Sequence, residues 1–208
     1  ADHLGLNYID NLDKMARVKG VIPEVVKPDG YAVLNADDPR VADMADNSKG
    51  QVIFFSLEGK SNPVITEHLK SSGTAVIFEE GSFCIMKGKW KYPLVEAKDV
   101  PITFDGKAIF NVSNAMAAIG AAIGMGVKNE NITAALTTFF PSFAQTPGRL
   151  TLMDMGAYKV MVDFAHNVAG YEGLAEFVKS LNPKRTIVTL CLPGDRRMED
   201  FDEVSKIA

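Results

Sequence analysis

Apolar residues in the first quarter of the chain follow two different periods. Residues 9–27 place apolar side chains at roughly helical spacing, which predicts an amphipathic helix. The runs YAVLNA (31–36) and QVIFFS (51–56) are short and almost continuously apolar, as is typical of strands buried in a parallel sheet. Between these two strands, Pro39 can occupy the first turn of a short helix over residues 39–47. The pattern therefore predicts a helix, a strand, a second helix and a second strand, in that order.

The pattern changes twice in the middle of the chain. Residues 60–110 contain short runs separated by glycine, proline and charged residues, which is typical of antiparallel strands and hairpins. The expected strands are TAVIFEE (74–80), SFCIMKG (82–88), KWKYPLVEA (89–97) and PITFDGKAIF (101–110). From Val112 the spacing becomes helical, and glycines among the alanines of residues 113–126 permit close packing of that helix. A further helix begins near Asn129 or Asn131, either of which can cap it.

The last part of the chain alternates between strand-like and helical segments. YKVMVDFA (158–165) and RTIVTLCL (185–192) have the apolar runs of strands, whereas GYEGLAEFVKSL (170–181) and the segment from Glu199 have helical patterns. An alternation of this kind predicts a parallel sheet joined by right-handed crossovers. We therefore expect an α/β protein of two domains, with a boundary near Pro147.

Composition and charge narrow the class of protein. The chain has 208 residues, of which 47% are hydrophobic and 23% charged, as in ordinary globular proteins. The net charge of −4 supplies no basic field for nucleic acid, so no nucleic-acid partner is expected. No apolar run reaches the length of a membrane span and no secretory signal opens the chain, so we expect no membrane partner. Assembly into a homo-oligomer stays open.

The two cysteines, Cys84 and Cys191, lie far apart within apolar stretches and form no CxxC pair. A zinc site is therefore not expected, and reduced thiols indicate a cytoplasmic protein. Both ends of the sequence cut through what look like longer elements, so we expect the chain to be a piece of a longer protein.

One glycine–lysine–serine triplet, Gly59 to Ser61, invites comparison with a phosphate-binding loop. The loop pattern is GxxxxGK[ST], in which backbone N–H groups of a glycine-rich turn surround a phosphate. Phe54 stands where the first glycine is required, and Pro63 is expected to interrupt the helix that should follow. We therefore predict that the chain contains no phosphate loop.

Polar residues follow three of the predicted strands. The motifs are NADDP (35–39), DFAHN (163–167) and PGDRR (193–197), and TPGR (146–149) precedes the second of them. In parallel sheets, ligands bind beyond the carboxyl ends of the strands. Aspartate and asparagine also cap helices and form turns, so each motif has a purely structural interpretation as well. Both interpretations stay open, with the structural one favoured for NADDP.

The order of short motifs along the whole chain resembles that of the Mur ligase superfamily of ATP-dependent amide ligases. The motifs are ADHLGL, ARVKG, NADDP, FNVSNAMAA, TPGRL, VDFAHN and PGDRR. The resemblance implies an α/β fold in which residues 1–147 form part of the central ATP-binding domain, a mixed sheet flanked by helices that lacks its phosphate loop. Residues 148–208 would form the truncated start of a Rossmann-like C-terminal ligase domain.

The resemblance also implies a reaction and its participants. Superfamily members use ATP and Mg²⁺ to convert a carboxylate into an acyl phosphate, which an amine then attacks. The member with the most similar motifs adds arginine to the side-chain carboxylates of poly-aspartate, so the implied partners are ATP, arginine and an acidic polypeptide acceptor. Alternatively, the chain belongs to a UDP-muramoyl-peptide ligase or to folylpolyglutamate synthase, or it is a nucleotide-binding module without catalytic activity.

The resemblance implies that three of the first 120 residues bind magnesium or contact adenine. His3, in DHLG, would help to hold magnesium, and Lys19, in ARVKG, would be a catalytic residue and an oxygen ligand if carbamylated. Asn114, in FNVSNAMAA, would contact adenine, because an amide both donates and accepts hydrogen bonds. Phe110 departs from the histidine that the superfamily often has there. The alternative interpretations are a helix-start histidine, a solvated lysine and a helix-terminal asparagine.

The remaining candidates lie in the second half of the chain. Arg149 would bind nucleotide and take part in catalysis, since a guanidinium matches the geometry of phosphate. Asp163 would accept hydrogen bonds from ribose hydroxyls, and His166 would be a catalytic residue near the phosphates. Asp195 and Arg196, in PGDRR, would contact the acceptor substrate. Each of these residues could instead be a solvated group at a turn, a strand end or a helix start.

Overall fold

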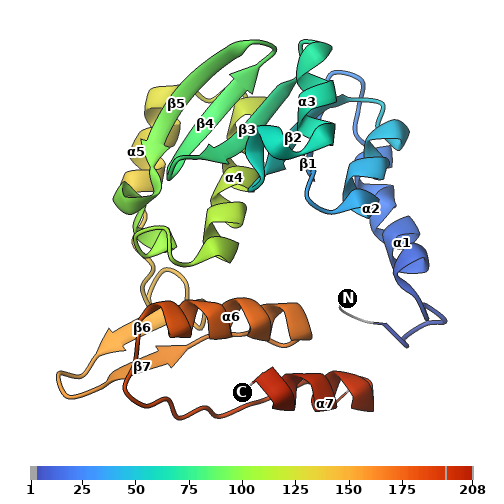
Figure 1. The fold of residues 1–208 in the computed structure, drawn as a ribbon. Helices are drawn as coiled ribbons and strands as arrows, with labels where there is room; N and C mark the ends of the chain where they lie inside the picture. Colours follow the sequence, from blue (N-terminus) through green and yellow to red (C-terminus); the bar gives the residue numbers. More distant parts are fainter. Residues whose placement is uncertain (1–3, 195, 208) are drawn as a thin grey trace. The chain divides into compact units, whose positions relative to one another are not determined.

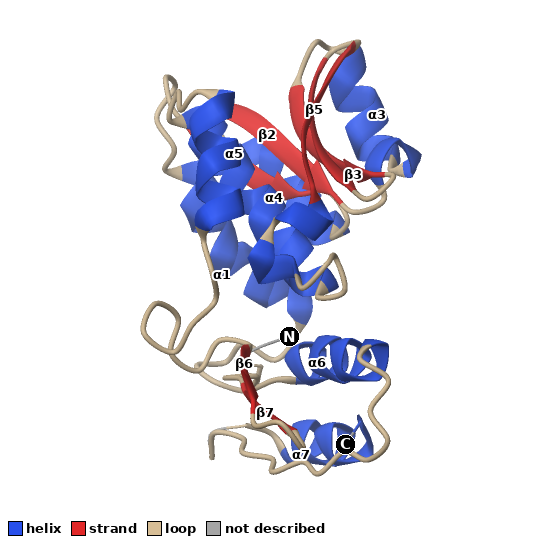
Figure 2. Cartoon of the chain, turned by 90° about the vertical axis from the view of Figure 1, so that its left-hand side faces the viewer, coloured by secondary structure: helices blue, strands red, loops and turns tan. Residues whose placement is uncertain are grey.

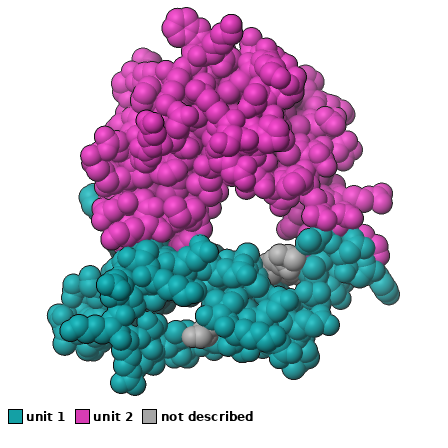
Figure 3. All heavy atoms as spheres, in the orientation of Figure 1, with its two compact units in different colours: residues 1–12, 139–208 teal, residues 13–138 magenta. Residues whose placement is uncertain are grey.

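The structure is a computed structural model that describes residues 4–194 and 196–207. Its helices and strands gather into two compact units, which Figure 3 shows in different colours. Unit 2 comprises Asp13–Thr138, and unit 1 comprises Ala1–Leu12 together with Phe139–Ala208. The division into domains expected from the sequence stays a prediction.

Unit 2 is built on a five-stranded mixed sheet with the strand order β1-β2-β3-β4-β5 (Figure 1). The strands are β1 (Tyr31–Asn35), β2 (Gln51–Ser56), β3 (Thr74–Glu79), β4 (Ser82–Lys87) and β5 (Trp90–Glu96). The first three are parallel, with Leu34 opposite Phe54 and Phe54 opposite Ala75. β4 and β5 continue the sheet as antiparallel strands, so β5 forms an edge. The expectation of a mixed sheet in an α/β fold is confirmed, and these five strands coincide with predicted ones.

Helices cover both faces of this sheet (Figure 2). α3 (Pro63–Lys70) and the short α2 (Pro39–Ala42) pack on one face, whereas α4 (Ile109–Gly124) and α5 (Asn129–Thr138) pack on the other. α1 (Leu12–Glu24) precedes the sheet and lies within the helix predicted from the sequence. Short 3₁₀ helices cover Asp43–Asn47, Gly59–Ser61, Ala97–Asp99 and Pro101–Thr103.

The strands of unit 2 divide their buried side chains between two clusters. Ile53 and Val76 belong to the cluster on the face covered by α4 and α5. Their neighbours Phe54 and Ile77 belong to the cluster on the opposite face, together with Ile65 of α3. Successive residues of a strand point to opposite faces, so β2 and β3 are buried on both sides. This double burial explains their nearly continuous apolar sequences, and removal of that apolar area from water is the main stabilising contribution.

Two glycines allow α4 to lie close to β1. A Cβ atom at Gly120 would come within 2.8 Å of a Val33 methyl carbon, and one at Gly124 would come within 2.9 Å of the Tyr31 Cβ. Both distances are shorter than van der Waals packing permits. The expectation that glycines permit close packing of this helix is confirmed.

The strand predicted for residues 101–110 is wrong. This segment forms a 3₁₀ turn, a loop and the beginning of α4. Phe104 and Asp105 have φ angles of 52° and 60°, in the left-handed region, which a strand cannot contain. The buried Thr103 hydroxyl donates to the carbonyl oxygen of Ala97 and accepts the N–H of Gly106, so the turn is fixed by its own hydrogen bonds.

Helix α3 lies where only strands were expected. Asn62 caps it by accepting the N–H of Val64 at 2.9 Å, and Pro63 occupies the first helical turn. Proline is favoured there because its missing N–H would have no helical partner. Pro63 therefore begins this helix instead of interrupting one.

Unit 1 contains a β-hairpin and two helices. β6 (Thr151–Asp154) and β7 (Lys159–Val162) are antiparallel, with Thr151 opposite Val162. α6 (Val168–Ser180) follows β7, and α7 (Met198–Ile207) comes last. The strand predicted at β7 and both predicted helices are confirmed, whereas β6 was not expected.

The parallel arrangement expected for this part of the chain is not found among the described residues. Its two strands are antiparallel, and residues 185–192 form no strand. A strand requires a neighbour for its backbone hydrogen bonds, and no described strand pairs with this segment, in which Ile187 is 80% exposed. Tyr171 of α6 nevertheless holds one end of it. The Tyr171 hydroxyl donates to the carbonyl oxygen of Cys191 at 3.0 Å and accepts the Cys191 N–H at 3.3 Å.

Candidate functional site

The open end of the β6–β7 hairpin brings two predicted nucleotide residues together. Thr151 lies opposite Val162, so the next residues outward, Leu150 and Asp163, face each other. The Oδ2 atom of Asp163 accepts the backbone N–H of Leu150 at 2.7 Å. Arg149 precedes Leu150 in the chain and is thereby held at the same end of the hairpin. The Oδ1 atom of Asp163 has no hydrogen-bond partner among the described residues, so it can accept one from a ligand.

The turn before β6 has a left-handed backbone. Gly148 has a φ of 69°, which glycine adopts without steric cost. Leu150 has a φ of 44°, which is uncommon for a residue with a side chain. Its buried side chain and its hydrogen bond to Asp163 hold it in this conformation. As a result, Leu150 points inward while Arg149 is exposed to solvent.

An aromatic ring connects the candidate residues of this site. The guanidinium carbon of Arg149 lies 5.0 Å from the centroid of the Phe164 ring, within the range of a cation–π interaction. The His166 ring lies 5.3 Å from the same Phe164 ring. Phe164 itself is 60% exposed, which is unusual for a phenylalanine that contacts two other side chains. The hairpin therefore gathers Arg149, Asp163 and His166 around Phe164.

His166 stands just before the positive end of a helix. Its Nδ1 atom lies 2.8 Å from the carbonyl oxygen of Phe164, and because a carbonyl can only accept, Nδ1 carries the hydrogen. In the neutral ring, Nε2 is then the acceptor atom. Asn167 caps α6 by accepting the N–H of Gly170 at 2.8 Å. The helix N-terminus and Arg149 both favour a negatively charged group near His166.

The PGDRR motif is only partly described. Asp195 lies outside the described residues, and Arg196 is half-buried. Arg197 lies directly before α7 and forms a two-point ion pair with Asp200 of that helix. Its Nη2 atom is 2.7 Å from Oδ1 of Asp200 and its Nε atom is 3.2 Å from Oδ2. This hydrogen bonding lowers the pKa of Asp200 and raises that of Arg197. The Arg197 guanidinium therefore stabilises the first turn of α7.

The NADDP motif contributes a structural carboxylate at the ends of β1 and β2. Asp37 accepts hydrogen bonds from the Ser56 hydroxyl, from the Leu57 N–H at 2.7 Å and from Nδ2 of Asn62 at 3.2 Å. Asn62 also donates to the carbonyl oxygen of Ala36 at 3.0 Å. Ser56 and Asn62 are buried, so this network ties β1, β2 and α3 together. Its hydrogen bonds support the structural interpretation of the motif.

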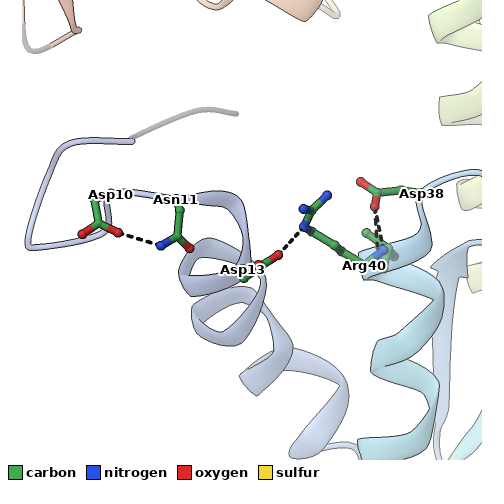
Figure 4. A network of polar contacts seen from close by, with 6 residues as sticks. Asp10, Asn11, Asp13, Asp38 and Arg40 are labelled. Carbon is green, nitrogen blue, oxygen red and sulfur yellow. Dashed lines mark hydrogen bonds and ion pairs between the residues drawn. The ribbon is translucent and has the colours of Figure 1, made fainter.

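The other polar residues of NADDP bind the backbone nearby, and Figure 4 shows Asp38 with Arg40. Asp38 caps α2 by accepting the N–H of Arg40 at 2.9 Å, and Asn35 accepts the N–H of Asp37 at the same distance. The Arg40 side chain donates from Nε to Asp13 of α1 at 2.7 Å. Both members of that ion pair are largely exposed, so it contributes little to stability.

The remaining predicted residues of unit 2 are exposed. Asn114 lies on α4, where its Nδ2 atom donates to Oδ1 of the buried Asn111 at 3.2 Å. Asn111 in turn donates to the carbonyl oxygen of Ile102 at 2.8 Å, which fixes the orientation of the pair. Lys19 lies on the solvent side of α1. The triplet Gly59–Ser61 forms a 3₁₀ turn before α3.

The described residues do not make up a magnesium site by themselves. His3 lies outside them, and within them no three histidine, cysteine, aspartate or glutamate side chains are placed to share a metal ion. Magnesium prefers several oxygen ligands in near-octahedral geometry. Lys19 alone does not supply them.

A family described as the Mur ligase middle domain matches residues 1–122. The chain belongs to the Mur ligase family. Curated relatives include the cyanophycin synthetases of Crocosphaera subtropica and Nostoc sp. (strain PCC 7120), which are 48% and 43% identical over all 208 residues. These 208 residues span 24% and 23% of the two relatives, or about a quarter of their length.

More distant Mur ligases share the fold. A UDP-N-acetylmuramoyl-L-alanyl-D-glutamate--2,6-diaminopimelate ligase of Caldanaerobacter subterraneus is 26% identical over 196 residues, which are 94% of this chain and 36% of that protein. A solved structure of a ligase with the same name is 16% identical, with a TM-score of 0.51 over 97% of this chain and 39% of that one. The structural likeness supports the Mur ligase fold and nothing finer.

Two residues with clear roles in this Mur ligase chain were not predicted. Phe164 was recognised only as part of a strand, although an aromatic residue next to a strand-end aspartate is a signal for a ring at the site. Asn62 was overlooked, although an asparagine directly before proline is a typical helix start. None of the helices in the described part of this chain has the length and apolar character that a membrane crossing requires.

Proposed function

We propose that the chain is part of an ATP-dependent amide ligase of the cyanophycin synthetase type. In this reaction an acceptor carboxylate attacks the terminal phosphorus of ATP, and ADP leaves. The amino group of arginine then attacks the acyl phosphate, and inorganic phosphate leaves as the amide bond forms. The acceptor would be the side-chain carboxylate of a poly-aspartate backbone. The sequence identity of 43–48% over the whole chain supports this substrate pair over those of the more distant ligases.

The observation that carries the proposal is the grouping of Arg149, Asp163 and His166 around Phe164. Phosphoryl transfer is catalysed mainly by positioning and by neutralising charge on phosphoryl oxygens. An exposed guanidinium fits the second task, and its stacking on Phe164 limits the positions that it can adopt. The unpaired Oδ1 of Asp163 fits a ribose hydroxyl, because a carboxylate only accepts hydrogen bonds.

Residues outside the hairpin have secondary roles in the proposal. Asn114 would contact adenine through its side-chain oxygen, which has no partner among the described residues. Mg²⁺ would accompany ATP, and His3 and a carbamylated Lys19 would be the candidate ligands from this chain. Asp195 and Arg196 would contact the acceptor. The cytoplasm is the expected location of such a ligase.

The test is a substitution that preserves the hairpin and changes one atom of the site. Asp163→Asn retains a side-chain oxygen for the Leu150 N–H and replaces the free carboxylate oxygen by an NH₂ group. In the full-length ligase, we expect kcat/KM for ATP to fall about tenfold, mainly through KM, because one hydrogen bond to a charged group is lost. Arginine-dependent ADP release with a poly-aspartate acceptor measures this effect.

A matched control lies at the other end of the same hairpin. Asp154 is exposed and accepts the N–H of Gly156 at 2.8 Å, so Asp154→Asn makes the same chemical change away from the site. We expect its kcat/KM for ATP to stay within twofold of the wild type. Equal losses in both variants would contradict the assignment of Asp163. ADP release that requires diaminopimelate and a UDP-linked muramoyl peptide instead of arginine would contradict the substrate assignment.

A further inference from the structure

The turn between β4 and β5 carries a basic and aromatic surface at the edge of the sheet. Residues 87–92 read KGKWKY, with three lysines, two aromatic residues and no acidic residue, in a chain whose net charge is −4. Trp90 is 83% exposed and Tyr92 is 49% exposed. The hairpin patch is defined here as Lys87, Lys89, Trp90, Lys91 and Tyr92.

Strand geometry places the aromatic residues together. Trp90 and Tyr92 are two positions apart on β5, so their side chains lie on the same face. Lys87 of β4 is directly opposite Trp90, which puts its side chain on that face as well. Gly88 and Lys89 form the two-residue turn between the strands, and the φ of 54° at Gly88 suits such a turn.

The lysines of the hairpin patch differ in whether a carboxylate pairs with them. Lys91 forms a hydrogen-bonded ion pair with Glu79 of β3, which lowers the pKa of that carboxyl. Lys87 and Lys89 are exposed, and no carboxylate among the described residues lies within 4.0 Å of either ammonium group. Two unpaired positive charges therefore flank an exposed aromatic pair. A solvated edge strand is commonly protected by lysine and proline, but protection does not require an exposed tryptophan beside tyrosine.

We propose that the hairpin patch binds an extended acidic polypeptide. Carboxylates of the polypeptide would pair with Lys87 and Lys89, while its peptide planes and methylene groups would cover Trp90 and Tyr92. Alternate residues of an extended chain repeat every 6.6–6.8 Å or so, which matches the repeat along the strand. Pro93 of β5 has no N–H, so the polypeptide binds through side chains and does not extend the sheet as a sixth strand.

Acidic polypeptide fits this surface better than nucleic acid does. Nucleic-acid domains usually spread basic residues over a whole face and have a high isoelectric point, whereas this chain has a sequence pI of about 5.4. A short basic patch in a chain of net charge −4 favours a partner that it contacts over only a few residues. The inference goes beyond the proposed ligase reaction and rests on it only for the choice of poly-aspartate as probe.

Trp90 provides a direct measurement because it is the single tryptophan of the chain. Poly-L-aspartate of about twenty residues is titrated into the 208-residue chain at low salt, without ATP, and tryptophan fluorescence is recorded. We expect a saturable change, and a loss of at least tenfold in affinity when salt is raised to about 0.5 M, because exposed charges are screened. The double variant Lys87→Glu/Lys89→Glu is expected to weaken binding at least tenfold.

A second pair of lysines serves as the control. Lys107 and Lys128 are exposed in the same unit without an ion-pair partner among the described residues, so Lys107→Glu/Lys128→Glu makes the same change in net charge. We expect affinity within twofold of the wild type for this control. Anisotropy of labelled oligo-aspartate extends the measurement to Trp90→Ala, which is expected to bind at least threefold more weakly. Circular dichroism verifies that each variant is folded.

Several outcomes would overturn the inference. They are equal losses in the two double variants, no saturable change in fluorescence, and tighter binding of a single-stranded oligonucleotide than of poly-aspartate. Because this assay contains no ATP or arginine, it is independent of the ligase test. A full-length enzyme with arginine-dependent ADP release and no binding at the hairpin patch would refute this inference and leave the proposed function intact.

Discussion

Unit 2 and unit 1 differ in how many of their apolar side chains they bury. Unit 2 encloses Val76, Ile77 and Phe83 completely, in clusters on either face of a five-stranded sheet. Among its described residues, unit 1 has a two-stranded hairpin and two helices. It buries Phe177 and Val204 but leaves other apolar side chains such as Phe140 and Ile187 largely exposed. A two-stranded hairpin has little stability of its own. The free energy of unfolding of the described chain therefore resides mainly in unit 2.

The polar candidate residues of the two units also differ, in whether their polar atoms are already hydrogen-bonded within the unit. In unit 2, the carboxylates of Asp37 and Asp38 are occupied by hydrogen bonds within the unit. In unit 1, Arg149 and Asp163 keep groups available for a ligand, and they are held by a turn and a single hydrogen bond. The difference indicates that a strand-exit motif can bind a ligand only where the fold leaves some of its polar atoms without a partner. Unit 1, which buries fewer apolar side chains, is therefore the unit that leaves more polar groups available to a ligand.

Among the substitutions that test this comparison, Phe83→Ala in unit 2 is expected to cause the largest loss of stability. Phe83 is completely buried and its ring packs against Phe78, so truncation leaves a cavity that costs about 3–5 kcal/mol. Urea denaturation measures the loss, and hydrogen exchange assigns it to a unit. The control is Phe164→Ala in unit 1, where the exposed ring is expected to contribute less than about 1 kcal/mol. Similar losses in the two variants would remove the distinction between the units.

A smaller effect is expected from Gly120→Ala in α4. Alanine normally stabilises a helix by about 1 kcal/mol relative to glycine. Here the added methyl group would lie 2.8 Å from a methyl carbon of Val33, so we expect a net destabilisation of about 1–3 kcal/mol. A lower urea concentration at the midpoint of unfolding, with an unchanged slope, would report this loss of stability. A stabilised Gly120→Ala variant would show that α4 and β1 are not in close contact.

The smallest effect is expected from Asp200→Asn in unit 1. The hydrogen bond from Arg197 lowers the pKa of Asp200, so this carboxylate adds stability above its unfolded pKa of about 4. That stability is lost as the pH falls through the lower folded value. At pH 6 we expect the variant to be less stable by up to about 1 kcal/mol, with the difference from the wild type shrinking below pH 4.

Urea unfolding at several pH values tests this expectation for Asp200. Asp202→Asn is the control, since Asp202 is an exposed residue of the same helix without an ion pair among the described residues. A pH dependence that is unchanged in Asp200→Asn would show that the ion pair contributes nothing to folding.

Strands with two buried faces were the most predictable elements of the fold. QVIFFS and TAVIFE are apolar at nearly every position because both clusters of unit 2 draw on them, and the predicted strands coincide with β2 and β3. The segment at 101–110 shows the limit of this signal. Its apolar residues suggested a strand, but left-handed φ angles at Phe104 and Asp105 turn the chain into α4. Hydrophobicity alone does not report backbone handedness.

The motifs supplied the candidate site residues but not their arrangement in space. Arg149, Asp163 and His166 were proposed from their motifs, whereas the unexpected strand β6 is the element that places Leu150 opposite Asp163 and so holds Arg149 at the same end of the hairpin. Likewise, the GKS triplet could be dismissed from spacing alone, but the start of α3 at Pro63 depends on the cap supplied by Asn62. Local spacing does not reveal which distant segment will pair.

The sequence by itself predicted the five strands of unit 2 and the residue types that follow the strands, and the resemblance of its motifs indicated the family. The strands depend on side-chain polarity and periodicity, which can be read residue by residue, whereas the family was inferred from the order of the motifs. Folding in three dimensions decided that Asp37 became a structural acceptor while Asp163 retained an available oxygen. The same side chain has either role, because its hydrogen-bond partners come from segments that the sequence places far away.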